Sequence, residues 1–227
     1  MDVYLVPIGA ARYELYCEVP DEPLEADGEA APGFFGRLKK RFSVMLAEAE
    51  HERRHGQNAE RHHEGWVARA KARSMRWVAE SIAEQRLLWH LRRQGAARLY
   101  YPDDIEEESA VATLRQQLRR DFDKHRFWLI VDSFGFVGSG LLFLLPGPNV
   151  IAYYFAFRMV GHYLSMRGAR QGLDGVAWTN EKSAPLAELR RAISLDGEER
   201  ERRVSDIADA LQLEHFVKFF ERIAVEA

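Results

Sequence analysis

The spacing of apolar residues along the chain predicts strands at its beginning. Short runs of β-branched and aromatic residues at Val3 to Ile8 and Tyr13 to Val19 flank a loop that contains Gly9, which is typical of a β-hairpin. A similar run at Arg98 to Tyr101 ends at a proline and predicts a third strand. Because two strands alone are marginally stable, we expect a small β element over residues 1–22, either a hairpin or a three-stranded sheet.

The pattern then becomes helical. Residues 23–33 are acidic and rich in Pro, Gly and Ala, which predicts a linker. Apolar residues recur at three- and four-residue steps from Phe34 onward, and we expect a helical body over residues 34–126. Its last helix, Ser109 to Arg126, has acidic residues near its start and basic residues near its end, which complement the helix dipole.

The C-terminal part of the chain predicts a compact helical cap over residues 165–227. Near its start lies a Gly-rich connection at Gly168 to Gly175. Three amphipathic stretches follow at Ala184 to Ile193, Glu198 to Leu211 and His215 to Val225. Together with the earlier segments, they predict a mainly α protein with a small N-terminal sheet.

The most informative segment is residues 127–164, which are apolar in an otherwise charged chain. Phe127 to Leu145 would rise about 28 Å as a helix, close to the hydrocarbon thickness of about 30 Å. After a break at Pro146 to Asn149, the shorter stretch from Val150 to Leu164 fits a re-entrant segment or a buried soluble helix as well as a span. We expect a central apolar helical hairpin that is membrane-bound.

Small residues and flanking charges bear on this hairpin. Gly135 and Ser139 have the four-residue spacing that lets helices approach closely in lipid, although loose packing in a soluble core would use them equally well. Basic residues flank both arms, whereas the tip has no charge. The positive-inside rule then places both chain termini on the cytoplasmic side. The helix-packing candidates are Gly135, Gly138, Ser139 and Gly140.

Three ionisable residues interrupt the apolar segment: Asp132, Arg158 and His162. Arg158 and His162 lie one helical turn apart and share a face. In lipid, such charges face a partner or an aqueous path, which suggests an Asp132 to Arg158 pair or a proton carried by His162. In a soluble protein the same residues would form a satisfied polar cluster.

The amino-acid composition disfavours several classes of function. With 47% hydrophobic and 30% charged residues, the chain has a globular composition, and its net charge of −3 disfavours a nucleic-acid partner. Cys17 is the only cysteine, which excludes an internal disulfide and a Cys-rich metal site. The acidic start predicts no secretory signal or mitochondrial transit peptide, and the abundance of Arg and Ala suggests a bacterial source.

One short motif suggests a metalloenzyme. His51, Glu52 and His55 match H-E-x-x-H, in which two histidines bind zinc and the glutamate activates a water. Two arginines lie between them and polar residues surround them, as on a solvated charged helix. A zinc-dependent hydrolase is therefore kept only as an alternative, and we expect no enzyme activity, no metal and no cofactor.

The residues around the break carry a resemblance to a known family. Leu145-Pro-Gly-Pro-Asn149, followed by Tyr153, Tyr154, Arg158 and Gly161-His162-Tyr163, resembles the mitochondrial potassium/proton exchange-related family, as does the opening VYLVPIGAARYELYCE. The resemblance implies a membrane protein of monovalent cation homeostasis, acting as an exchanger component or an accessory factor. It nominates Asn149, Arg158 and His162 as motif positions.

These observations predict a protein of the bacterial cytoplasmic (inner) membrane with a role in potassium/proton exchange. Its candidate ion-pathway residues are Asp132, Asn149, Arg158 and His162. Two arms cannot enclose an ion path shielded from lipid, so a homo-oligomer or a membrane partner is expected in addition to the lipid bilayer. The alternative is a soluble or peripheral helical interaction protein whose core contains the apolar hairpin.

Overall fold

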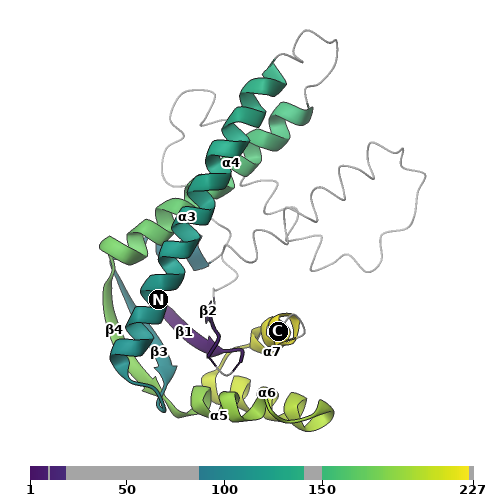
Figure 1. The fold of residues 1–227 in the computed structure, drawn as a ribbon. Helices are drawn as coiled ribbons and strands as arrows, with labels where there is room; N and C mark the ends of the chain where they lie inside the picture. The colour runs from purple at the N-terminus through teal and green to yellow at the C-terminus, as the bar shows by residue number, and fades with distance from the viewer. Residues whose placement is uncertain (10, 19–86, 141–149, 225–227) are drawn as a thin grey trace, which may run out of the picture. The chain divides into compact units, whose positions relative to one another are not determined.

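The computed structural model describes most of the chain outside its central region (Figure 1). The described residues are 1–9, 11–18, 87–140 and 150–224. The chain divides into two compact units, which we call the sheet unit (residues 1–19, 87–126 and 164–227) and the arm unit (residues 20–86 and 127–163). Most described residues are helical and the strands are few, which confirms the predicted mainly α fold with a small sheet.

The sheet has four strands in the order β2-β1-β3-β4. Strand β1 (Asp2–Pro7) pairs antiparallel with β2 (Tyr13–Tyr16) and parallel with β3 (Ala96–Pro102), which confirms the hairpin and the third strand. A fourth strand, β4 (Ala177–Ser183), pairs in parallel with all seven residues of β3 and was not predicted. Its sequence AWTNEKS has no apolar alternation because it lies at the edge of the sheet and is only partly buried.

One hydrophobic core of the sheet unit lies between the sheet and the C-terminal helices. The helices α5 (Ala184–Ala192), α6 (Gly197–Leu211) and α7 (Phe216–Ala224) agree closely with the three stretches predicted from the sequence. Apolar side chains from all three pack with side chains from β1 and β2 in one cluster that includes Tyr4, Val6, Ile8, Tyr16, Leu186, Leu189, Val204, Ile207, Phe216 and Phe220. The cluster contains Tyr4 and Val6 of β1, and Val3 and Leu5 on the other face of the strand are also fully buried, so β1 is an almost continuous apolar run, as expected for a central strand that is buried on both faces.

Two long helices continue from the sheet unit into the arm unit, namely α3 (Glu107–Gly140) and α4 (Val150–Asp174). The predicted Gly-rich connection at Gly168 to Gly175 is wrong, because α4 runs through most of it. Its glycines serve packing instead of a turn: a Cβ at Gly168 would lie 1.7 Å from the carbonyl oxygen of Leu88, and one at Gly172 would lie 2.5 Å from the Leu91 side chain. Gly168 thus lets α4 touch the backbone of the helical segment 87–91.

The apolar segment forms parts of α3 and α4 where it is described, which we call the first arm (residues 127–140) and the second arm (residues 150–163). In the part of the chain that the structure describes, none of the helices combines the length and the hydropathy that crossing a bilayer requires. The predicted linker, the break at Pro146 to Asn149 and most of the predicted helical body lie outside the described residues. The domain boundaries stay predictions.

Candidate functional site

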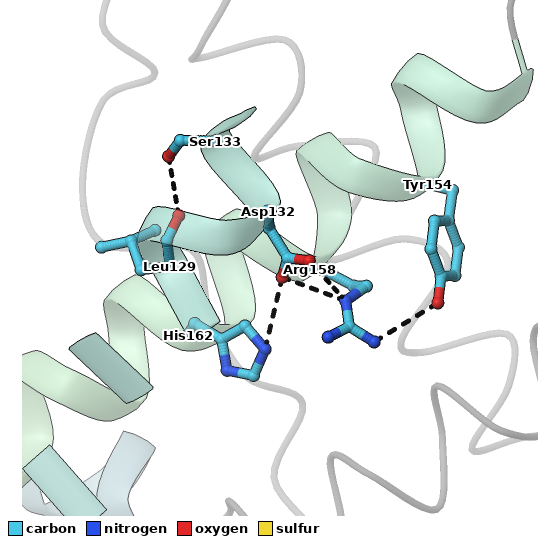
Figure 2. A network of polar contacts seen from close by, with 6 residues as sticks. All are labelled: Leu129, Asp132, Ser133, Tyr154, Arg158 and His162. Carbon is cyan, nitrogen blue, oxygen red and sulfur yellow. Dashed lines mark hydrogen bonds and ion pairs between the residues drawn. The ribbon is translucent and has the colours of Figure 1, made fainter. Parts of the chain in front are cut away.

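The three ionisable residues of the apolar segment meet between the two arms (Figure 2). The Nε atom of Arg158 donates to both carboxylate oxygens of Asp132, at 2.9 Å and 3.0 Å. The Nε2 atom of His162 lies 3.4 Å from the Oδ2 atom of the same carboxylate. One aspartate on α3 therefore contacts two residues that are spaced four apart on α4, which places both on one helical face. We call these three residues the polar cluster.

The polar cluster is largely withdrawn from solvent. The side chain of Asp132 is 2% exposed, that of His162 is 13% exposed and that of Arg158 is 18% exposed. A carboxylate in such surroundings requires a compensating charge and hydrogen bonds, because removing it from water costs several kcal/mol. Arg158 supplies both, so the pair satisfies the most buried charge in the apolar segment.

Aromatic rings complete the surroundings of the guanidinium group. Its central carbon lies 5.4 Å from the ring centre of Trp128 and 5.7 Å from that of Tyr154, within the range of cation–π attraction. The Nη1 atom of Arg158 also donates to the Tyr154 hydroxyl at 3.3 Å (Figure 2). Burial opposes the charged guanidinium, but the hydrogen bonds to Asp132 and Tyr154 outweigh it and raise the pKa of Arg158. Arg158 is accordingly a fixed cation.

The chemistry that this cluster offers is proton binding. Histidine is the residue type whose charge changes near neutral pH, and the Nε2 atom of His162 lies beside a carboxylate that can accept a hydrogen bond from a protonated nitrogen. With a neutral imidazole, the charges of Asp132 and Arg158 balance; protonation adds one positive charge to the buried cluster. The carboxylate is already occupied by Arg158, so it is a poor ligand for a metal cation.

Close approach of the two arms depends on small residues of α3. A Cβ at Gly135 would lie 2.4 Å from the ring of Phe155 on α4, so only glycine leaves room for that ring. Ser139 is buried, and its hydroxyl donates to the carbonyl oxygen of Phe136 at 2.7 Å. A Cβ at Gly138 would have open space around it, with no atom within 4 Å, while Gly140 is the last residue of α3.

The opposite face of the first arm is apolar and exposed. Phe134 is 74% exposed and Val137 is 72% exposed, whereas Asp132 on the other side of the same helix is buried. At about 100° per residue, Asp132, Gly135 and Ser139 share one face and the exposed residues share the other. The exposed residues of this face are Phe127, Ile130, Val131, Phe134 and Val137. The first arm is therefore polar and small toward its neighbour and apolar toward the outside.

Sequence reasoning nominated the polar cluster but missed its aromatic surroundings. Tyr154 precedes Arg158 by four residues, and this spacing could have placed it on the same face. Trp128 likewise precedes Asp132 by four residues, which places it on the face of α3 that carries the carboxylate. Asn149, and the zinc-motif residues His51, Glu52 and His55, lie outside the described residues. Among the residues that are described, no group of three or more His, Cys, Asp or Glu side chains could hold a metal ion.

Comparison with known proteins gives one result. A family model described as mitochondrial K+-H+ exchange-related matches residues 3–173, which include both arms and the polar cluster. No curated protein and no solved structure matches the chain. The match covers more than half of the chain.

Proposed function

We propose, because the chain belongs to the mitochondrial K+-H+ exchange-related family, that it is a membrane-associated protein that supports K+/H+ exchange. The observation that carries this proposal is the buried cluster of Asp132, Arg158 and His162 inside a pair of helices with an apolar outer face. Soluble helices bury their apolar face and expose their charges. Reversed polarity is what a membrane environment favours.

In this proposal His162 holds the proton. Its Nε2 atom is the group of the cluster that can gain and release a proton near neutral pH, and Asp132 stabilises the protonated imidazole. Arg158 keeps the carboxylate in place and prevents it from binding a metal cation strongly. The cluster therefore responds to protons and not to K+.

The role is that of an exchanger component or an accessory factor, and the cluster favours the accessory role. A K+ path needs a row of oxygen ligands shielded from lipid, which two arms cannot enclose. A second copy of the chain or a membrane partner would have to supply that path. We place the protein at a bacterial cytoplasmic (inner) membrane, with both termini on the cytoplasmic side.

The test is potassium-driven proton movement across membrane vesicles from cells with and without the protein. Asp132→Asn, Arg158→Gln and His162→Gln should each reduce the protein-dependent component, because each removes one member of the cluster. Asp174→Asn and Arg170→Gln are the matched controls, since these α4 side chains are 73% and 75% exposed. Unchanged movement in all three cluster variants would remove the proposed roles.

Reconstitution of the purified protein distinguishes an exchanger component from an accessory factor. If the purified protein alone moves K+ against protons in proteoliposomes, it is an exchanger component. If flux depends on it in cell-derived vesicles but not in proteoliposomes, it is an accessory factor. A loss of flux in the control variants as well would indicate a general defect and would count against a specific role of the cluster.

A soluble or peripheral helical interaction protein is the second candidate. It is favoured by the pairing of Asp132 with Arg158 and His162, because buried charges in soluble proteins are also paired and hydrogen-bonded. Cell fractionation distinguishes the candidates. Retention of the protein on membranes through high-salt and carbonate washes supports the membrane role, and recovery in the soluble fraction before any wash supports the alternative.

A further inference from the structure

We propose that the apolar outer face of the first arm inserts into one leaflet of a bilayer that contains anionic lipid. This face consists of Phe127, Ile130, Val131, Phe134 and Val137. The inference rests on the proposed function for the presence of a membrane, and it assigns the surface of the chain that contacts the lipid and the class of lipid that it prefers.

The geometry of the face fits a leaflet. Its residues recur at three- and four-residue steps along α3, so they form a single stripe. From Phe127 to Val137 the helix rises about 15 Å, which is about half of the hydrocarbon thickness of a bilayer. A stripe of this length reaches the middle of a bilayer without crossing it.

The two serine hydroxyls and the one charge of the first arm have partners within the chain. The Ser133 hydroxyl donates to the carbonyl oxygen of Leu129 at 2.7 Å (Figure 2), and the Ser139 hydroxyl makes the similar bond to Phe136. The one charge of the arm, on Asp132, faces α4. Protein interfaces need about one hydrogen bond per 100–200 Å², whereas acyl chains offer none. A face without available hydrogen-bonding groups therefore matches lipid better than a protein partner.

Partly exposed aromatic residues with a polar end accompany the stripe. Trp128, Tyr154 and Tyr163 are between about one third and one half exposed, with values of 39%, 37% and 46%. Such side chains prefer the boundary between headgroups and acyl chains, because one end is apolar and the other can meet water. Trp128 and Tyr154 lie against Arg158 and not within the stripe, and together with Tyr163 they give the two arms side chains that are typical of a membrane surface.

The charged residues near the stripe indicate which class of lipid it prefers. The turns of α3 that directly precede Phe127 carry an excess of cations, since two acidic residues, Asp121 and Asp123, accompany four exposed basic ones, and Asp123 pairs with Arg126 at 3.7 Å. The four basic residues are Arg119, Arg120, Lys124 and Arg126. In the described arms themselves, Asp132 is the only acidic residue, and it is buried against Arg158. Cations next to an inserting apolar face attract anionic headgroups, each adding about 1 kcal/mol near a charged surface. Phosphatidylglycerol supplies such headgroups, whereas phosphatidylcholine does not.

The experiment is binding of the purified full-length protein to protein-free vesicles of phosphatidylcholine, with and without phosphatidylglycerol. We expect tighter binding to the anionic vesicles. Phe134→Asp should weaken it about 100-fold, since a charge replaces an apolar group in the acyl region. Ala112→Asp is the matched control, because it adds the same charge at an exposed position of the same helix outside the stripe. Because Phe134 is exposed, circular dichroism of the variant should match that of the wild type.

The outcomes separate this inference from the proposed function, since vesicle binding needs no exchanger. Equal binding of the wild type and Phe134→Asp would overturn the inference even if potassium-driven proton movement remains intact. Equal binding to both vesicle types would overturn the assignment to anionic lipid. A wild type that ignores vesicles but dimerises, with Phe134→Asp monomeric, would show that a second copy covers the face. If the protein binds vesicles but its presence does not change potassium-driven proton movement, the inference stands and the result counts against the proposed function.

Discussion

The packing of the two arms predicts different effects for the same substitution at two glycines three residues apart. Gly135→Ala places a methyl group 2.4 Å from the ring of Phe155, and Gly138→Ala places one where no atom lies within 4 Å. Both variants gain about 1 kcal/mol of helix propensity. Gly135→Ala also carries the cost of overpacking, about 1–3 kcal/mol, as the ring is forced aside.

Both variants gain the same helix propensity, so the difference between their stabilities measures the contact of residue 135 with Phe155. We expect Gly138→Ala to stabilise the arms by about 1 kcal/mol. The arms of Gly135→Ala should be less stable than those of Gly138→Ala by about 1–3 kcal/mol. Hydrogen exchange of peptides from residues 127–140 and 150–163 measures this, because protection reports local opening. The difference corresponds to roughly 5- to 150-fold in protection. Equal protection in the two variants would refute the assignment of Gly135 to the inner face.

Three further predictions concern the polar cluster and the sheet unit. Arg158→Ala should destabilise the arms by about 3 kcal/mol, at the low end of the cost of breaking a buried ion pair because Arg158 is partly solvated, and hydrogen exchange of peptides from residues 127–140 and 150–163 should be faster than in the wild type. Gly168→Ala should lower the free energy of unfolding by about 3 kcal/mol in denaturant titrations, since its methyl group would meet a backbone carbonyl that cannot rotate away. Burial, Asp2 and Tyr100 raise the pKa of Tyr4 to about 12. The stability that its neutral hydroxyl contributes is therefore full below about pH 10 and is lost as the pH rises through about 12. Tyr4→Phe should resist alkaline unfolding, followed by circular dichroism, better than the wild type.

The sequence predicts the elements of the sheet unit where apolar residues alternate or recur. The runs of β1, β2 and β3 are visible because their side chains enter the core. The edge strand β4 is not visible, because its position beside β3 comes from backbone pairing and not from apolar side chains. The glycines of α4 were misread because Gly168 provides close contact with another backbone, which a pattern of single residues does not distinguish from a turn.

The polar cluster could be predicted in part. Arg158 and His162 share a face of α4 by their spacing alone, and Asp132 is the single acidic residue available in the apolar segment. The rotation of α3 about its axis could be predicted only in part, because the four-residue spacing of Gly135 and Ser139 nominates a packing face but is equally compatible with loose packing in a soluble core. The structure settles it: Gly135 faces Phe155 and Phe134 is exposed. This rotation decides which residues remain on the outside.

The central claim is that His162 is the proton-binding group of a membrane-associated protein that supports K+/H+ exchange. Its most direct test is the pH dependence of potassium-driven proton movement in membrane vesicles that contain the wild type or His162→Gln. We predict that the protein-dependent movement of the wild type changes across the range where imidazoles titrate, around pH 6.5, and that the variant shows no such change. The same pH profile in both proteins would contradict the claim.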